Sequence, residues 1–210
     1  MIEYASDPVR VGNVIIGGGN PIVVQTMCNT HTSDVGASFK QCMRLFQAGA
    51  QMIRLTVPSM AQVAHISEIR RRLREAGCDV PIVADVHFSS DIAIAVASEV
   101  DKVRINPGNF SKNFETAQFR FAELVRVCKT YGTAIRIGVN HGSLGERITE
   151  LYGNTAEGMK EAAMEWLRMC RENDFHNVVV SLKASNTCVM VEAYRLLVVA
   201  MIAEDMHYPI

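Results

Sequence analysis

The stretch Ala-Ile-Arg-Ile-Gly-Val-Asn at residues 134–140 alternates apolar and polar side chains, as a strand does when its two faces meet different surroundings. A helical pattern that begins near Asn113 and ends at Gly132 comes directly before it. Six runs rich in β-branched residues have this strand character, at residues 22–28, 52–57, 81–87, 102–106, 134–140 and 177–185. Strands that alternate with helices in this way predict a parallel sheet joined by right-handed crossovers.

The length of the repeating unit indicates which parallel fold to expect. Six strand–helix units occupy residues 22–205, about 31 residues each, so eight units would need about 245 residues. A (β/α)8 TIM barrel has roughly 250 residues. A doubly wound sheet should carry a glycine-rich phosphate loop after its first strand, but Gly17-Gly18-Gly19 comes earlier and is interpreted as a turn of an N-terminal hairpin. We therefore expect an α/β fold, a TIM barrel truncated after about six units, with residues 207–210 beginning a seventh strand.

Capping residues and glycines predict where the helices begin and end. Asp34 and Gly49 should bound the first helix, and Ser59 and Gly77 the second. Further helices should begin near Ser90, Asn113, Thr155 and Thr187. No linker or low-complexity segment divides the chain, so we expect residues 1–210 to form one incomplete barrel domain.

Composition excludes several classes of protein. The chain is 49% hydrophobic and 20% charged, with a net charge of -1, as in an ordinary soluble domain without the basic excess of a nucleic-acid or membrane-surface binder. No apolar run is long enough to span a membrane, and the N-terminus has no signal-peptide core. Six cysteines without a C-x-x-C motif predict reduced thiols, no metal site and a cytoplasmic protein, although a plastid protein without its transit peptide would look the same.

One face of the predicted strands is polar at their carboxyl-terminal halves. The opposite face is apolar throughout and must contact the helices, so the polar face is predicted to point into the barrel. Most barrel interiors are filled by Val, Ile and Leu, which makes this one unusual. The inward set comprises Arg54, Thr56, Asp85, His87, Arg104, Asn106, Arg136, Gly138, Asn140, Ser181, Lys183 and Ser185.

Positive charge exceeds negative charge in this inward set. Its four cations are Arg54, Arg104, Arg136 and Lys183, and its one acidic residue is Asp85. Unpaired charges of one sign are costly inside a protein, and arginine and lysine bind phosphate oxygens well. Barrel enzymes place their active sites at the carboxyl ends of the strands, where these cations lie. We therefore predict a multiply charged anionic ligand; the alternative is a set of interior ion pairs with acids elsewhere.

Further polar residues follow the strand ends. His87 shares a face with Asp85 and is a candidate for substrate contact or proton relay, or for a purely structural hydrogen bond. Residues 106–109, Asn-Pro-Gly-Asn, form a predicted turn whose glycine allows a ligand to approach the backbone. Residues 140–143, Asn-His-Gly-Ser, form a similar turn, and Ser143 is predicted to cap the short helix after it.

Six segments together resemble the 4-hydroxy-3-methylbut-2-enyl diphosphate synthase family, the GcpE/IspG family. They are VGNVIIG (11–17), QTM (25–27), ADVHF (84–88), VRINPGN (103–109), RIGVNHGSL (136–144) and SLKASN (181–186). The resemblance extends over residues 9–210, and two further segments, 146–153 and 189–197, are similar to the longer three-domain form of the family.

The resemblance implies an oxidoreductase of the non-mevalonate isoprenoid pathway. Such an enzyme reductively opens 2-C-methyl-D-erythritol 2,4-cyclodiphosphate and yields 4-hydroxy-3-methylbut-2-enyl diphosphate. The barrel binds the diphosphate, and a separate C-terminal domain carries a [4Fe-4S] cluster on three cysteines and a glutamate. Electrons come from flavodoxin or ferredoxin. This chain lacks the cluster motif and the last strands, so the resemblance implies that it binds no cofactor and is inactive alone.

The family's diphosphate-binding residues fall on Arg54, Arg104, Arg136, Asn140 and Lys183. Asp85, His87 and Asn106 are added as nearby polar contacts, and no residue is assigned a catalytic role. Two other classes stay open: a dihydropteroate-synthase-like barrel transferase, and a non-enzymatic anion-binding module. Open sheet edges at the first and sixth strands predict a homo-oligomer.

Overall fold

Six parallel strands form one curled sheet in the computed structural model, which describes residues 4–210. The strands are β3 (Gln25–Met27), β4 (Met52–Thr56), β5 (Ile82–Asp85), β6 (Lys102–Ile105), β7 (Ala134–Asn140) and β8 (Val178–Lys183). Each strand pairs in parallel with the next one along the chain, as in a barrel. The expected α/β fold, a TIM barrel truncated after about six units, is therefore confirmed.

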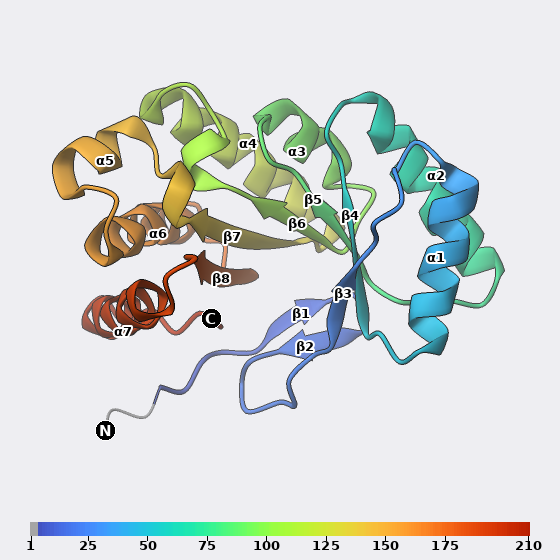
Figure 1. The fold of residues 1–210 in the computed structure, drawn as a ribbon, viewed down its shortest axis with the longest axis horizontal. Helices are drawn as coiled ribbons and strands as arrows, with labels where there is room; N and C mark the ends of the chain where they lie inside the picture. Colours follow the sequence, from blue (N-terminus) through green and yellow to red (C-terminus); the bar gives the residue numbers. More distant parts are fainter. Residues whose placement is uncertain (1–3) are drawn as a thin grey trace.

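Helices cover the outer face of this sheet (Figure 1). They are α1 (Val35–Gln47), α2 (Ala61–Glu75), α3 (Ser90–Val96), α4 (Phe114–Tyr131), α5 (Glu146–Tyr152), α6 (Ala156–Glu172) and α7 (Thr187–Ala203), with 3-10 turns η1 (Pro107–Asn109) and η2 (His141–Ser143). The apolar face of the strands packs against them, and Ile53, Leu55 and Ile137 are fully buried in that core. The predicted division of the strands into an apolar outer face and a polar inner face is correct.

Most predicted helix ends are found in the structure, and Ser59 is the exception. The side chains of Asp34, Asn113 and Thr155 accept hydrogen bonds from backbone N–H groups of α1, α4 and α6. Ser59 does not cap α2, which begins after Met60, because its hydroxyl contacts the side chain of Gln62 instead. Thr187 is the first residue of α7, and the residue before it provides the cap.

A short antiparallel hairpin closes the amino-terminal end of the barrel interior. Its strands are β1 (Val9–Val11) and β2 (Val14–Ile16), joined through Gly12, whose φ of 56° suits glycine. Residues 17–19 therefore follow the hairpin, and the prediction that they form its turn was wrong. The buried side chains of the hairpin pack against the first inward residues of the strands, Met52, Val83, Ala134 and Val179. Four strands thus meet the hairpin through apolar side chains, whereas β6 places Lys102 in the same layer.

The two edge strands are shorter than predicted. Ile22 is 94% exposed and Val24 is 58% exposed, so the strand expected at 22–28 is reduced to β3. β3 has a partner strand on one side only, which limits the hydrogen bonds that can extend it. At the other edge, residues 207–210 form no strand, although the Val180 N–H donates to the carbonyl of Pro209 at 2.8 Å. Within residues 4–210, no helix is both long and apolar enough to cross a membrane.

Candidate functional site

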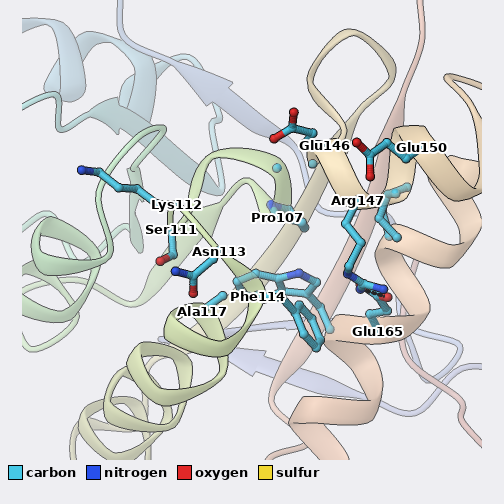
Figure 2. A pocket seen from close by; sticks show the side chains of 15 residues that line it. Pro107, Ser111, Lys112, Asn113, Phe114, Ala117, Glu146, Arg147, Glu150 and Glu165 are labelled. Atoms are coloured by element: carbon cyan, nitrogen blue, oxygen red, sulfur yellow. Dashed lines mark hydrogen bonds and ion pairs between the residues drawn. The ribbon is translucent and has the colours of Figure 1, made fainter.

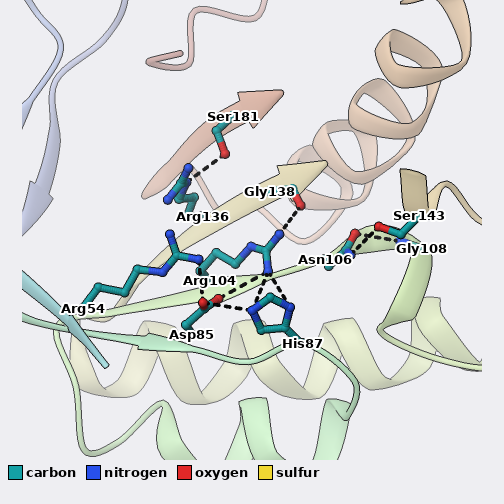
Figure 3. Close-up of polar contacts among 10 residues, drawn as sticks. All are labelled: Arg54, Asp85, His87, Arg104, Asn106, Gly108, Arg136, Gly138, Ser143 and Ser181. Carbon is teal, nitrogen blue, oxygen red and sulfur yellow. Dashed lines mark hydrogen bonds and ion pairs between the residues drawn. The ribbon is translucent and has the colours of Figure 1, made fainter. Parts of the chain in front are cut away.

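The carboxylate of Asp85 is the centre of the polar interior (Figure 3). It lies at the end of β5, 2% exposed, and accepts hydrogen bonds from Arg54 Nη2 at 2.6 Å and Arg104 Nη1 at 3.3 Å. His87 Nε2 lies 2.9 Å from the same carboxylate, as their shared strand face predicts. Three side chains from β4, β6 and the end of β5 therefore share one negative charge.

Arg104 is held on two sides. Besides its contact with Asp85, its Nη2 donates to the carbonyl of Gly138 on β7 at 2.9 Å. A Cβ atom at position 138 would overlap the guanidinium, so the absence of a side chain there makes room for Arg104. The glycine in the RIGVN segment is thus explained by the packing of an arginine from the neighbouring strand.

Arg136 has no carboxylate partner among the residues that the structure describes. Its Nε donates to the hydroxyl of Ser181 on β8 at 2.8 Å, and this partner is neutral. Nearby, Arg54 Nε is buried and makes no hydrogen bond to any of residues 4–210. The interior therefore contains guanidinium groups whose charge and hydrogen-bonding capacity are only partly used.

The pKa values of the buried side chains agree with this excess of positive charge. Burial and the neighbouring Arg54 and Arg104 lower the pKa of Arg136 to about 10. Burial also lowers the pKa of Arg104 below its usual value, despite its contact with Asp85. Burial alone would raise the pKa of Asp85, but the charge of Arg54 and the contacts with His87 and Arg104 outweigh it and hold that pKa below its usual value. The carboxylate is ionised, and the arginines remain short of negative charge.

Lys102 is an inward residue that the sequence analysis missed. It lies on β6 two residues before Arg104, on the same strand face, and is 3% exposed. Burial, with the charges of Arg136 and Arg54, lowers its pKa to about 7. The alternation of KVRIN turns it to the same face as Arg104, but it lies in the amino-terminal half of the strand, whereas the predicted site residues lie in the carboxyl-terminal halves.

Two turns at the mouth of the barrel are in direct backbone contact. Asn106 Nδ2 donates to the Ser143 hydroxyl at 2.9 Å, and a Cβ atom on Gly108 would overlap the Ser143 carbonyl. The predicted close approach at Gly108 is therefore made to another turn of the protein. Ser143 does not cap α5, because α5 begins after Gly145 and its first turn has no side-chain cap. That prediction was wrong, since the Ser143 hydroxyl is engaged by Asn106.

Asn140 and Lys183 lie side by side at the carboxyl ends of β7 and β8. Asn140 is half-buried and Lys183 is exposed, and neither joins the network around Asp85. The structure thus gathers Arg54, Asp85, His87 and Arg104 into one cluster, with Arg136 beside it, and leaves this pair at the rim. His141 is a loop residue whose Nε2 lies 2.8 Å from the Asn154 carbonyl.

Two cavities of similar size differ in their relation to this cluster. A cavity of about 650 Å³ opens into the barrel interior, where Lys102, Arg136 and Ser181 line it. A cavity of about 500 Å³ lies outside the sheet between η1, α4, α5 and α6, and Figure 2 shows it. Its lining includes Phe114 and Arg147, whose guanidinium lies 4.6 Å from the centre of the phenyl ring. None of the predicted site residues lines this outer cavity.

The iron–sulfur cluster that the resemblance implies would need several cysteines and a carboxylate close together. Within residues 4–210, no three His, Cys, Asp or Glu side chains are placed to hold a metal ion. Cys28 and Cys42 are in contact, with 3.5 Å between their sulfur atoms, and all six cysteines are free thiols. The described residues do not fit such a cluster, and we assign none of its chemistry to them.

Fold and site together define a class of protein: a (β/α) barrel domain whose inner face carries a cluster of arginines at the carboxyl ends of its strands. The family model described as the GcpE TIM-barrel domain matches residues 6–210, and the chain belongs to that family.

Curated relatives agree with this assignment. The chain is 46% identical to the 4-hydroxy-3-methylbut-2-en-1-yl diphosphate synthase (flavodoxin) of Parabacteroides distasonis, over 98% of this chain and 36% of that protein. It is also 46% identical to the 4-hydroxy-3-methylbut-2-en-1-yl diphosphate synthase (ferredoxin) of a Synechococcus species, over 96% of this chain and 55% of that protein. The chain thus spans between about a third and about half of the length of these relatives.

Among solved structures, the dihydropteroate synthase of Xanthomonas albilineans is similar in fold, with a TM-score of 0.61 over 92% of this chain and 75% of that one. Sequence identity is 13%, so the likeness extends to the barrel architecture alone. It gives no support to the alternative of a pterin-binding transferase.

Proposed function

We propose that this barrel binds the diphosphate of 2-C-methyl-D-erythritol 2,4-cyclodiphosphate, as the substrate-binding domain of an enzyme that forms 4-hydroxy-3-methylbut-2-enyl diphosphate. One observation carries the proposal: Arg54, Arg104 and Arg136 lie close enough for their charges to interact, and among residues 4–210 Asp85 is the only carboxylate in contact with any of them. The relatives are named as synthases of this diphosphate product, which supports the choice of substrate.

The charge of the interior suits this anion. With Asp85 ionised, the three arginines leave an excess of two positive charges, and a cyclic diphosphate carries one negative charge on each phosphate. Asn140 and Lys183 at the rim would then contact the part of the ligand nearest the mouth. His87 and Asn106 would act as polar neighbours, with His87 held in place by Asp85.

The part of the reaction that these residues perform is binding and orientation. Guanidinium groups already fixed by Asp85, Gly138 and Ser181 neutralise the diphosphate without further reorganisation. Reductive opening of the ring needs electrons, and cations, an amide and an imidazole do not deliver them. We therefore propose that a protein made of these 210 residues binds the cyclodiphosphate without converting it.

Electrons for the complete reaction would come from flavodoxin or ferredoxin, which the names of the two relatives specify. We also propose a bacterial cytoplasmic location, which rests on the six cysteines without a C-x-x-C motif.

Calorimetric titration of the cyclodiphosphate into the wild type and an Arg136→Met variant tests the proposal. Arg136 has a neutral partner, so its removal breaks no ion pair and should leave the fold intact. We expect affinity to fall by at least about tenfold, because a charge-assisted contact to phosphate is lost. Arg126→Met, which removes an exposed arginine of α4, is the matched control. Equal affinity in all three proteins would refute the proposal.

A further inference from the structure

Lys102 is a buried cation that no acidic residue of the described chain neutralises. It points into the barrel from β6 and is 3% exposed, and it lines the interior cavity of about 650 Å³ together with Arg136 and Ser181. Burying an ammonium group without a counter-ion is strongly unfavourable. A lysine in this position therefore either binds a counter-ion or loses its proton and becomes uncharged.

The groups that face Lys102 from every neighbouring element are basic or uncharged. β4 provides Arg54 and Met52, β7 provides Arg136 and Ala134, and β8 provides Val179 and Ser181. β5 provides Val83, its register partner, while Asp85 further along that strand is engaged by Arg54, Arg104 and His87. The cavity that Lys102 lines is also lined by Gln25 of β3, by Tyr4 before the hairpin and by Pro209 and Ile210. The hairpin packs its apolar Val9 and Val11 against Val83 and Ala134, the register partners of Lys102.

We propose that Lys102 is uncharged in the empty barrel and takes up a proton from solvent when a doubly charged anion occupies the site. This inference rests on the proposed function, because the anion is the diphosphate that the arginines bind. Negative charge that enters the interior reverses the sign of the potential at Nζ, and the amine then gains more from being protonated than it loses by desolvation. A pKa of about 7 for Lys102 in the empty site is consistent with this.

Proton uptake would give the site a further positive charge only when the ligand is present. The empty barrel avoids the repulsion between Lys102, Arg136 and Arg54, and the occupied barrel uses the extra cation to hold the anion. Affinity would then depend on pH even though the cyclodiphosphate, with one diester charge on each phosphate, does not itself titrate near neutrality.

Calorimetry of 2-C-methyl-D-erythritol 2,4-cyclodiphosphate binding at pH 8, in buffers with different ionisation enthalpies, counts the protons taken up. We expect roughly one proton per bound anion in the wild type, and an affinity that falls by nearly tenfold per pH unit just above neutrality. Lys102→Met should abolish the uptake and flatten the pH profile. Lys102→Arg should also abolish the uptake but keep high affinity at pH 9, because arginine stays charged. Lys112→Met, an exposed lysine outside the barrel interior, should behave as the wild type.

Other results would contradict the inference, the proposed function, or both. Binding by the wild type without proton uptake, or equal uptake in Lys102→Met, would overturn this inference and leave the proposed function standing. Absence of binding by the wild type would overturn the proposed function and this inference with it.

Discussion

Arg104 donates to the carbonyl of Gly138 across 2.9 Å, and its guanidinium fills the space that a side chain at position 138 would need. The two residues come from the adjacent strands β6 and β7. Nη2 of Arg104 makes the contact with Gly138, while Nη1 of the same guanidinium donates to Asp85. Glycine at 138 and arginine at 104 therefore form one unit of the site.

Gly138→Ala should damage this unit. The added methyl group would displace Arg104 from a closely packed position, and we expect a loss of about 1–3 kcal/mol in the free energy of unfolding, measured with denaturant. Affinity for the cyclodiphosphate should fall as well. Gly142→Ala is the control, because a Cβ atom there meets no other atom within 4 Å. Equal stability of the two variants would show that the interior can repack around Arg104.

Asp85→Asn should be strongly destabilising. It leaves Arg54 and Arg104 buried without their shared counter-ion, which typically costs about 3–5 kcal/mol. Asp205→Asn is the control, since that side chain is 98% exposed. Thermal and denaturant unfolding at neutral pH should separate the two variants clearly, and a variant at position 85 as stable as the control would contradict the role of Asp85 as counter-ion.

Acid should remove the same stabilisation from the wild type. Because the pKa of Asp85 is lower in the folded than in the unfolded protein, its contribution is complete above its ordinary pKa of 3.8 and is lost as pH falls through the folded value. The free energy of unfolding of the wild type should therefore drop more steeply below pH 4 than that of Asp85→Asn. Parallel acid profiles would contradict this assignment.

Lys102→Met should stabilise the empty protein below neutral pH, by about 1–4 kcal/mol, because it removes an unpaired buried charge. In the wild type, the folded pKa of Lys102 is about 7, below the ordinary 10.5, so the unfolded state binds more protons between these values. Stability should consequently rise with pH across this window, and the variant should lack that rise. Lys112→Met serves as the control, and a variant at 102 less stable than the wild type at pH 6 would refute the prediction.

Self-association should follow from the open edges of the sheet. β3 and β8 each have only one partner strand among the described residues, and edges of this kind pair readily with other chains. Sedimentation analysis over a range of concentrations should reveal dimers or larger species. A monomer at every concentration would show that the edges are protected.

Features that depend on neighbouring residues could be predicted from the amino-acid sequence. Alternation along segments such as 134–140 predicted both the strands and the inward direction of Arg54, Arg104 and Arg136, because a strand turns successive side chains to opposite faces. Asp34, Asn113 and Thr155 predicted helix starts, since a cap bonds to the backbone only a few residues away. The family resemblance carried by the strand ends was confirmed by the match over residues 6–210.

Which of these groups are in contact depends on the three-dimensional arrangement of the strands and could not be predicted from the sequence. The curled sheet makes Asp85 the shared partner of Arg54 and Arg104. It also brings Ser181 to Arg136, 45 positions earlier in the sequence. The Ser143 hydroxyl, predicted to cap a helix, instead accepts a hydrogen bond from Asn106. The curled sheet also encloses Lys102 among cations, which alternation alone could not show. Local patterns specify the face on which a side chain lies, whereas its partners and its charge state depend on the register and curvature that join distant strands.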